Sequence, residues 1–209
     1  MKRILMSSIF LITFSIYAQK VKTILHFKTG DSIVGFSKGI NYESIKFSID
    51  KKGGYKKADI ENIDKVILYY KEGKEEYHHL YVKKKKKEEE FFARLVSKGI
   101  INHYIYSSNF SQTYASYKKI NVGNGTVINQ TTYNNTTHNL NLFYLKKKND
   151  KYSAYISDIY YSIFGEKKFR KNAIPFFNDC PKLVKKIKSK EFKKSDIIEI
   201  IEFYNNECN

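Results

Sequence analysis

The chain has 209 residues, a formal net charge of +17 and 42% hydrophobic residues. The length fits one compact domain or two small ones, and the hydrophobic content with only 2 prolines excludes a disordered tail. The 18 tyrosines and 15 phenylalanines favour strands. The positive charge indicates either attraction to anionic partners or a lysine-rich solvated surface. We favour the second, because net charge reports on solubility more than on function.

The first residues have the pattern of an export signal. Two basic residues precede an uncharged apolar run at residues 4 to 16, and Ala18 suits the last position before a signal-peptidase cut. We therefore predict a cleavable signal peptide over residues 1 to 18 and a mature chain that begins at Gln19. An uncleaved anchor is the alternative, but the run is shorter than the ~20 residues that span a bilayer.

No later apolar stretch approaches spanning length. The sequence therefore predicts an exported protein without a transmembrane segment, located in the periplasm or associated with the outer membrane or cell surface.

The region after the signal reads as short strands with tight connections. Period-2 alternation and Gly-Asp or Gly-Gly turn signals separate them. Strands are expected at 21–27, 32–37, 44–49 and 65–70, with a helical turn at 58–62. Such strands could make a small SH3-like or Sm-like barrel, or they could be part of a larger antiparallel sheet.

Further strands are expected at 77–83, 91–98 and 101–107. Between the first two lies a block of charge, with lysines at 83–87 and glutamates at 88–90. This block could be a phosphate or membrane patch. Because the glutamates partly cancel the lysines, a solvated connection or a lysine-guarded strand edge is the favoured interpretation.

Residues 108 to 139 are polar and rich in Asn, Thr and Ser, and residues 123 to 125 form a Gly-Asn-Gly hairpin-tip signal. The segment is interpreted as a long, mobile hairpin or loop. Loops of this length are often functional, so a partner surface is sought here first. Two more strands are expected at 140–147 and 152–156.

After Gly165 the hydrophobic period changes to that of helices. Pro175 must kink or shorten the first helix, Pro181 suits the first turn of a second, and Ser195 is expected to cap a third. The predicted fold class is α+β. An antiparallel β-rich body spans residues 19–164, and a C-terminal segment of about three helices spans residues 165–209.

The chain contains two cysteines, Cys180 and Cys208. If the second and third helices pack antiparallel, both cysteines lie at the same end of the pair, which is the geometry a disulfide needs. An exported protein also reaches a compartment that permits the bond. A free nucleophilic cysteine is the alternative and would need a base and a site that stabilises the thiolate.

Several motifs together resemble a group of exported Bacteroidota proteins. These motifs are the Gly-Asp-x-Ile-x-Gly opening within residues 27–35, the Asp-Ile pair at 59–60, the Asp-Cys-Pro segment within 177–181 and the Tyr-Asn-x-x-Cys ending at 204–208. The resemblance covers most of the chain apart from residues 108–139. It implies export and fold, and it implies no activity.

No motif assigns a catalytic, cofactor-binding or metal-binding residue, so no cofactor is expected. No Cys/His spacing matches a zinc site, and no nucleophile elbow, Walker loop or His-Glu-x-x-His appears. His78 and His79 are adjacent, so on a strand they point to opposite faces and cannot chelate one ion together.

Two functions remain open from the sequence. The first is a non-enzymatic binding or structural component of the periplasm or cell envelope with a basic surface, whose partner could be an anionic envelope polymer or lipid headgroups. Export argues against nucleic acid, which lies in another compartment. The second is an envelope hydrolase whose site is assembled only by the fold. A pocket that holds His79 or His103 against a carboxylate would favour the hydrolase.

Overall fold

The computed structural model describes residues 20–41, 43–84, 87–121, 127–158 and 165–208. The predicted signal peptide, with its cleavage site at Ala18 and Gln19, lies outside these residues. The strands are β1 (Val21–Phe27), β2 (Ser32–Asn41), β3 (Ser44–Ser48), β4 (Lys56–Ala58), β5 (Ile63–Tyr70), β6 (Gly73–Lys84), β7 (Lys87–Ser97), β8 (Ile101–Asn121), β9 (Val127–Lys147) and β10 (Ala154–Asp158). The α-helices are α1 (Gly165–Phe176), α2 (Pro181–Lys188) and α3 (Ile197–Glu207), with 3-10 turns η1 (Ile60–Asn62) and η2 (Lys194–Asp196).

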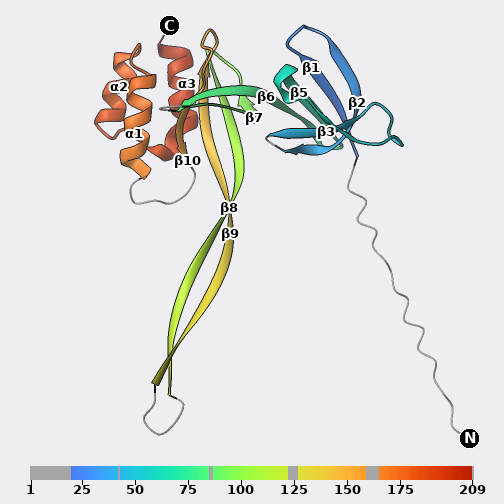
Figure 1. The fold of residues 1–209 in the computed structure, drawn as a ribbon. Coiled ribbons are helices and arrows are strands. Elements are labelled where there is room, and N and C mark those ends of the chain that lie inside the picture. The colour runs from blue at the N-terminus through green and yellow to red at the C-terminus, as the bar shows by residue number, and fades with distance from the viewer. Residues whose placement is uncertain (1–19, 42, 85–86, 122–126, 159–164, 209) are drawn as a thin grey trace, which may run out of the picture.

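In the described residues, the strands form one antiparallel sheet in the order β10-β9-β8-β7-β6-β5-β1-β2-β3-β4, and the helices follow at the C-terminal end (Figure 1). The predicted α+β class, with a β-rich body and a helical ending, is therefore confirmed. The small barrel expected for residues 21 to 70 is not confirmed, because the strand order runs open from β10 to β4.

The N-terminal strands β1 to β5 enclose a core that includes Leu25, Ile45 and Val66, and Tyr77 of β6 and Phe92 of β7 complete it. Two glycines of the Gly-Asp-x-Ile-x-Gly opening have distinct physical roles there. Gly30 adopts a φ of 96° in the turn between β1 and β2, a conformation that favours glycine. A Cβ on Gly35 would lie 2.4 Å from the backbone oxygen of Ser48, so only glycine fits where β2 approaches β3.

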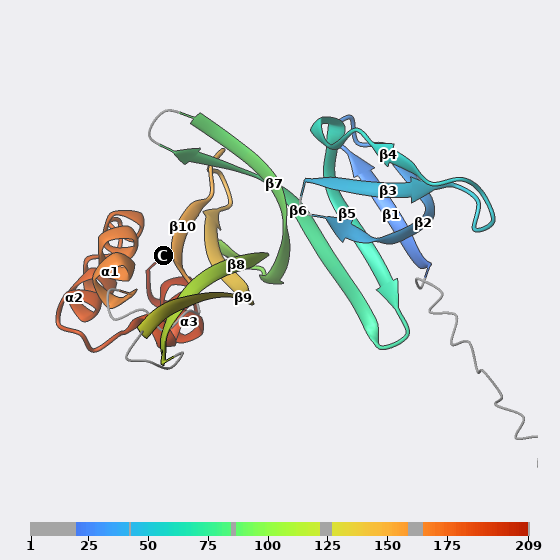
Figure 2. The same cartoon turned by 60° about the horizontal axis from the view of Figure 1, so that its bottom comes forward.

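Strand β6 joins the N-terminal strands to the rest of the sheet (Figure 2). Its residues 73–78 pair with β5, and its residues 77–84 pair with β7. The charge block falls at the far end of this second pairing, where Lys84 forms an ion pair with Glu89 across the hairpin. The described residues of the block therefore belong to an exposed β-hairpin connection, in which Lys83 lies opposite Glu88 and Lys84 opposite Lys87.

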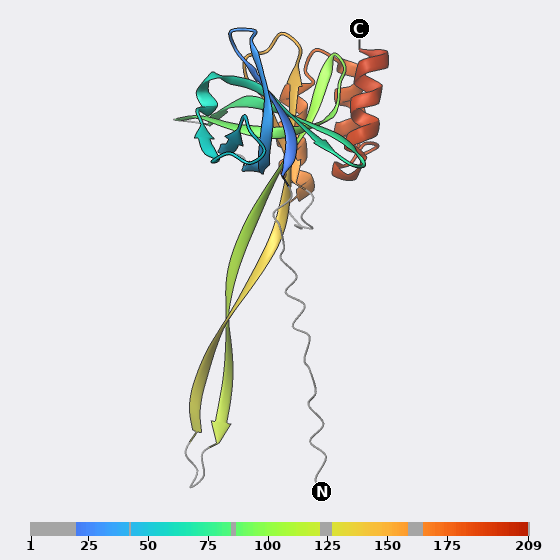
Figure 3. The same ribbon diagram turned by 90° about the vertical axis from the view of Figure 1, so that its right-hand side faces the viewer.

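Strands β8 and β9 form a long hairpin that projects from the rest of the molecule (Figures 1 and 3). Their pairing is continuous from Ile101 opposite Lys147 to Asn121 opposite Val127. The polar segment 108–139 thus continues the strands in its described part, and we call this projecting part the arm. The Gly-Asn-Gly tip at 123–125 lies outside the described residues.

The three helices cover one face of the sheet at the β8-β9-β10 end. Phe143, Leu145 and Ile156 of the sheet pack against a helical core that contains Phe169 and Phe177. The alternation of strand residues sends the neighbouring Leu142 and Tyr144 to the opposite face, where they belong to a separate cluster. The apolar residues at helical spacing after Gly165, among them Phe169 and Ala173, are therefore the ones that α1 buries against the sheet.

The helix ends follow the sequence in two cases and depart from it in one. Pro175 lies one residue before the end of α1, and Pro181 is the first residue of α2. The prediction that Ser195 caps the third helix is wrong. Asp196 precedes α3 instead, and its carboxylate accepts a hydrogen bond from the backbone N–H of Lys193, which favours the short turn η2 before the helix.

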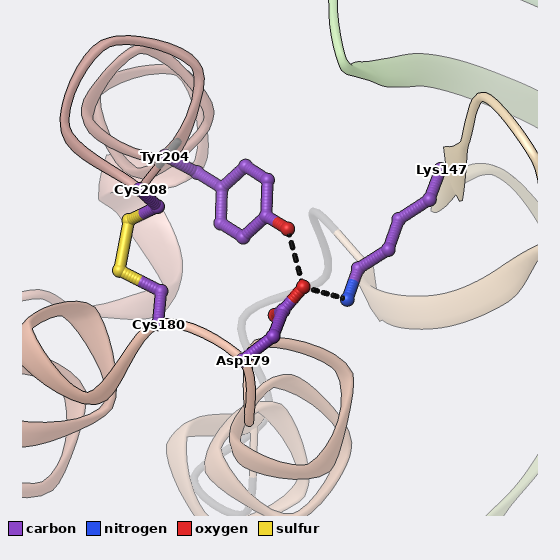
Figure 4. Close-up of a disulfide and its surroundings, with 5 residues drawn as sticks. All are labelled: Lys147, Asp179, Cys180, Tyr204 and Cys208. Carbon is purple, nitrogen blue, oxygen red and sulfur yellow. Dashed lines mark hydrogen bonds and ion pairs between the residues drawn. A yellow bond between two sulfur atoms is a disulfide. The ribbon is translucent and has the colours of Figure 1, made fainter.

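Cys180 and Cys208 lie at disulfide distance, with their Cα atoms 5.4 Å apart and their sulfur atoms bonded (Figure 4). The bond joins the start of α2 to the residue that follows α3. Beside it, Asp179 accepts hydrogen bonds from Lys147 Nζ at 2.7 Å and from the Tyr204 hydroxyl at 2.6 Å. This carboxylate thereby links the helices to the end of β9.

The contacts of Asp179 predict how stability depends on pH. Although partial burial alone raises the pKa of Asp179, the hydrogen bonds from Lys147 and Tyr204 outweigh it and hold the pKa below its usual value. A depressed carboxyl pKa stabilises the fold above the unfolded-state pKa of about 4, and the effect is lost as pH falls through the folded-state pKa. Asp179→Asn should therefore lower the free energy of unfolding at pH 7 by up to about 1 kcal/mol, since the carboxylate is partly exposed.

Urea unfolding of both proteins at pH 7 and pH 3 checks this, with the difference expected to shrink at the lower pH. Glu202→Gln is the matched control, because Glu202 is exposed on α3 and its removal changes the net charge equally. An equal effect of the two substitutions at pH 7 would contradict the role of Asp179.

Candidate binding groove

A groove lies beside α1, on the sheet face that carries Leu142 and Tyr144. It has a volume of about 680 Å³, and four elements supply its walls. Strands β6, β9 and β10 form the floor, and α1 forms one rim. We call it the lysine–tyrosine groove. Its lining residues are Val82, Lys83, Lys84, Leu140, Leu142, Tyr144, Ser153, Ala154, Tyr155, Asp158, Lys168, Lys171, Asn172 and Pro175.

The floor of the groove is aromatic and aliphatic. The rings of Tyr144 and Tyr155 meet edge to face, with centroids 5.7 Å apart, and Leu142 lies beside them. Burial raises the pKa of both tyrosines, and for Tyr155 the hydrogen bond to Asp158 raises it further. Both phenols therefore stay protonated at physiological pH and do not act as bases, and the Tyr155 hydroxyl donates its hydrogen bond to Asp158 at 2.7 Å.

The rim of the groove is positively charged. Four exposed lysines line it against the single carboxylate of Asp158. Lys168 lies 3.7 Å from that carboxylate and 4.7 Å from the centre of the Tyr155 ring. Among the described residues, Lys83 and Lys171 form no ion pair within 4.0 Å, although Lys83 lies opposite Glu88 and its charge helps to lower the pKa of that carboxyl.

A second hollow of about 400 Å³ continues from the groove and shares Lys84, Leu142 and Tyr144 with it. Its further aromatic residues are Phe91 and Tyr106, whose rings lie 4.6 Å apart. Three glutamates also line it, so its charge is opposite to that of the groove. The two hollows together form one aromatic surface that is basic at the α1 end and acidic at the other.

The histidine pair at 78 and 79 behaves as the strand pattern predicts. His78 contacts Glu76 at 2.6 Å and the Tyr104 hydroxyl at 3.1 Å. His79 lies on the other face against Phe92.

His79 Nε2 lies 3.3 Å from a Glu90 oxygen, so one candidate histidine does meet a carboxylate. Only 1% of the His79 side chain is exposed, and burial lowers its pKa. His79 lines neither hollow.

His103 is buried against Phe143, and burial with the nearby charge of Arg94 lowers its pKa to about 4. It is therefore neutral at physiological pH. In the part of the chain that the structure describes, no three His, Cys, Asp or Glu side chains gather as a metal site. Within that same part, none of the helices is long and apolar enough to cross a bilayer.

Local sequence patterns do not predict the groove, because its residues come from positions 82–84, 140–144, 153–158 and 168–175. Two signals pointed toward it. Leu140, Leu142 and Tyr144 alternate along one strand face, and basic residues interrupt the apolar stripe of α1. These residues of β9 and α1 form one groove only because α1 packs beside β10.

No family model, curated protein or solved structure matches this chain. The groove must therefore be interpreted from its own chemistry.

Proposed function

We propose that this chain is an exported, non-enzymatic binding protein of the periplasm or cell surface, and that the lysine–tyrosine groove holds an anionic polymer. The observation that carries the proposal is the composition of the groove, with four lysines and one carboxylate around an aromatic floor. Export rests on the predicted signal at residues 1–18. The bonded pair Cys180 and Cys208 and the resemblance to exported Bacteroidota proteins are compatible with it.

The groove chemistry favours an acidic polysaccharide. The half-buried ring of Tyr155 offers an apolar surface that suits the face of a sugar, and the buried ring of Tyr144 packs against it. The positive charges of Lys83 and Lys171, which form no ion pair within 4.0 Å among the described residues, suit carboxylate or phosphate substituents. A lipid surface is the weaker alternative, because flat headgroup layers do not reach the floor of a groove that lies between a helix and a sheet.

The test is the affinity of the processed chain for an acidic polysaccharide such as polygalacturonate, with neutral dextran as the reference. Lys83→Gln with Lys171→Gln should weaken binding about tenfold, the loss expected when two exposed charge contacts of about 0.7 kcal/mol each disappear. Binding should also weaken as salt rises from 0.15 M to 1 M, because the Debye length falls from about 8 to 3 Å.

The matched control is Lys52→Gln with Lys182→Gln, which removes two exposed charges from outside the groove. If both double variants bind the polysaccharide equally weakly, the effect comes from net charge alone and the groove is not the binding site. Equal binding of dextran would overturn the anionic ligand. Stronger binding to anionic vesicles than to the polysaccharide would assign the lipid surface instead.

A hydrolase is supported by one observation, the contact between His79 and Glu90. We place it second, because this histidine is almost fully enclosed and lines neither hollow, so a substrate has no access to its ring.

A further inference from the structure

The arm carries two sheet edges that nothing in the described structure covers. Strand β7 pairs with β8 at residues 103–105, and β10 pairs with β9 at residues 142–145. Beyond these points, the described residues of β8 and β9 pair only with each other. An isolated two-stranded hairpin is at best marginally stable in water. A hairpin of this length is therefore expected to gain stability from a further strand.

The β9 edge of the arm lacks the usual protection against strand pairing, whereas β8 carries Lys118 and Lys119. Natural proteins guard exposed edges with lysine, proline or bulges. Residues 120 to 145 contain no Asp, Glu, Lys, Arg or Pro, in a chain in which 28% of the residues are charged. The pairing of β8 with β9 also continues without a register shift. The outer edge of β9 over residues 127–139 is thus open, uncharged and regular.

The charge distribution indicates which partner fits this edge. An anionic partner is attracted to the lysines of the body and gains nothing from a neutral strand. A second copy of a chain with net charge +17 is repelled by that body. It meets the least repulsion along the uncharged β9 strand of the arm, although the neighbouring β8 carries Lys118 and Lys119. About 15 residues of strand extend roughly 50 Å, many times the Debye length of about 8 Å, so arm pairing keeps the two bodies apart.

We propose that the β9 edge at residues 127–139 pairs with the same edge of a second copy of this chain and forms a twofold dimer. Identical edges that meet across a twofold axis close the assembly, since each copy uses its one β9 edge. The pairing adds backbone hydrogen bonds on one side of the arm and turns two hairpins into a four-stranded ribbon. The proposal is independent of what the lysine–tyrosine groove binds.

The test measures the mass of the processed chain in solution by light scattering. The parent chain should have the mass of two chains. A variant in which Asn-Gly replaces residues 111–137 keeps the pair of Phe110 with His138 at a two-residue turn, and it should have the mass of one chain. An unchanged circular dichroism spectrum in the helical region would show that the variant is folded.

A second measurement locates the contact. Both native cysteines are in the disulfide, so Thr132→Cys, at an exposed arm position, provides the only free thiol for a spin label. Dipolar coupling between labels should appear there, whereas Lys52→Cys on the body should give none. A parent chain with the mass of one chain, a dimer that survives arm removal, or coupling from Lys52→Cys alone would overturn the proposal.

Discussion

Phe177→Ala is expected to lower the free energy of unfolding by about 3–5 kcal/mol, the range measured for buried phenylalanines. Phe177 is fully buried between the helices and the sheet, and its ring centre lies 5.5 Å from that of Tyr204. Truncation removes the apolar contact and leaves a cavity, because neighbours on α1, α3 and β9 are fixed by their own elements. Urea unfolding followed by tyrosine fluorescence measures the change.

The control for this substitution is Ile198→Ala. Ile198 also lies in the helical segment, but it is 57% exposed, so its truncation should change stability by less than about 0.5 kcal/mol. A loss below about 1 kcal/mol for Phe177→Ala would mean that the helices do not pack on the sheet as described.

Replacement of both cysteines, Cys180→Ser with Cys208→Ser, is expected to cost roughly 3 to 4 kcal/mol in the chain-entropy model. The two residues are separated by 28 positions, so the bond removes much of the freedom of the unfolded C-terminal segment. The parent chain treated with a reductant should become as unstable as the variant, and the variant should not respond to the reductant.

Thiol trapping and intact mass of the native protein give the complementary measurement. Processing after Ala18 and no trappable thiol are expected. Two free thiols in native material would contradict both the bond and the oxidising compartment. An unprocessed start would contradict the signal peptide while leaving the helical packing intact.

Much of the fold could be predicted from the sequence, because local patterns determine it. The alternation at Ile45 and Phe47, the turn at Gly30 and the helical spacing of Phe169 and Ala173 each mark an element that the structure contains. The placement of Cys180 and Cys208 at the same end of the helix pair could also be predicted, because the first precedes α2 and the second follows α3. These features depend on residues that are near one another in the chain.

The features that sequence reasoning missed depend on long-range pairing. Nothing in residues 21–70 distinguishes a closed barrel from the end of an open sheet, because the outcome depends on β6 pairing with β5. The lysine–tyrosine groove likewise needs β10 to lie between β9 and α1. The polar composition of residues 108–139 does not distinguish a loop from a hairpin. The alternation that marks a half-buried strand is weak when neither face of the strand is buried.

The division of β6 between two partners has a consequence for dissecting the molecule. Only Tyr77 and His78 are paired with β5 on one side and with β7 on the other. A fragment that ends before β6 leaves β5 without its partner strand on that side, and a fragment that begins after β6 leaves β7 without its partner there. Either half, expressed alone without β6, would expose a strand edge with unpaired backbone N–H and C=O groups. Recombinant fragments of this protein would therefore each need to include β6.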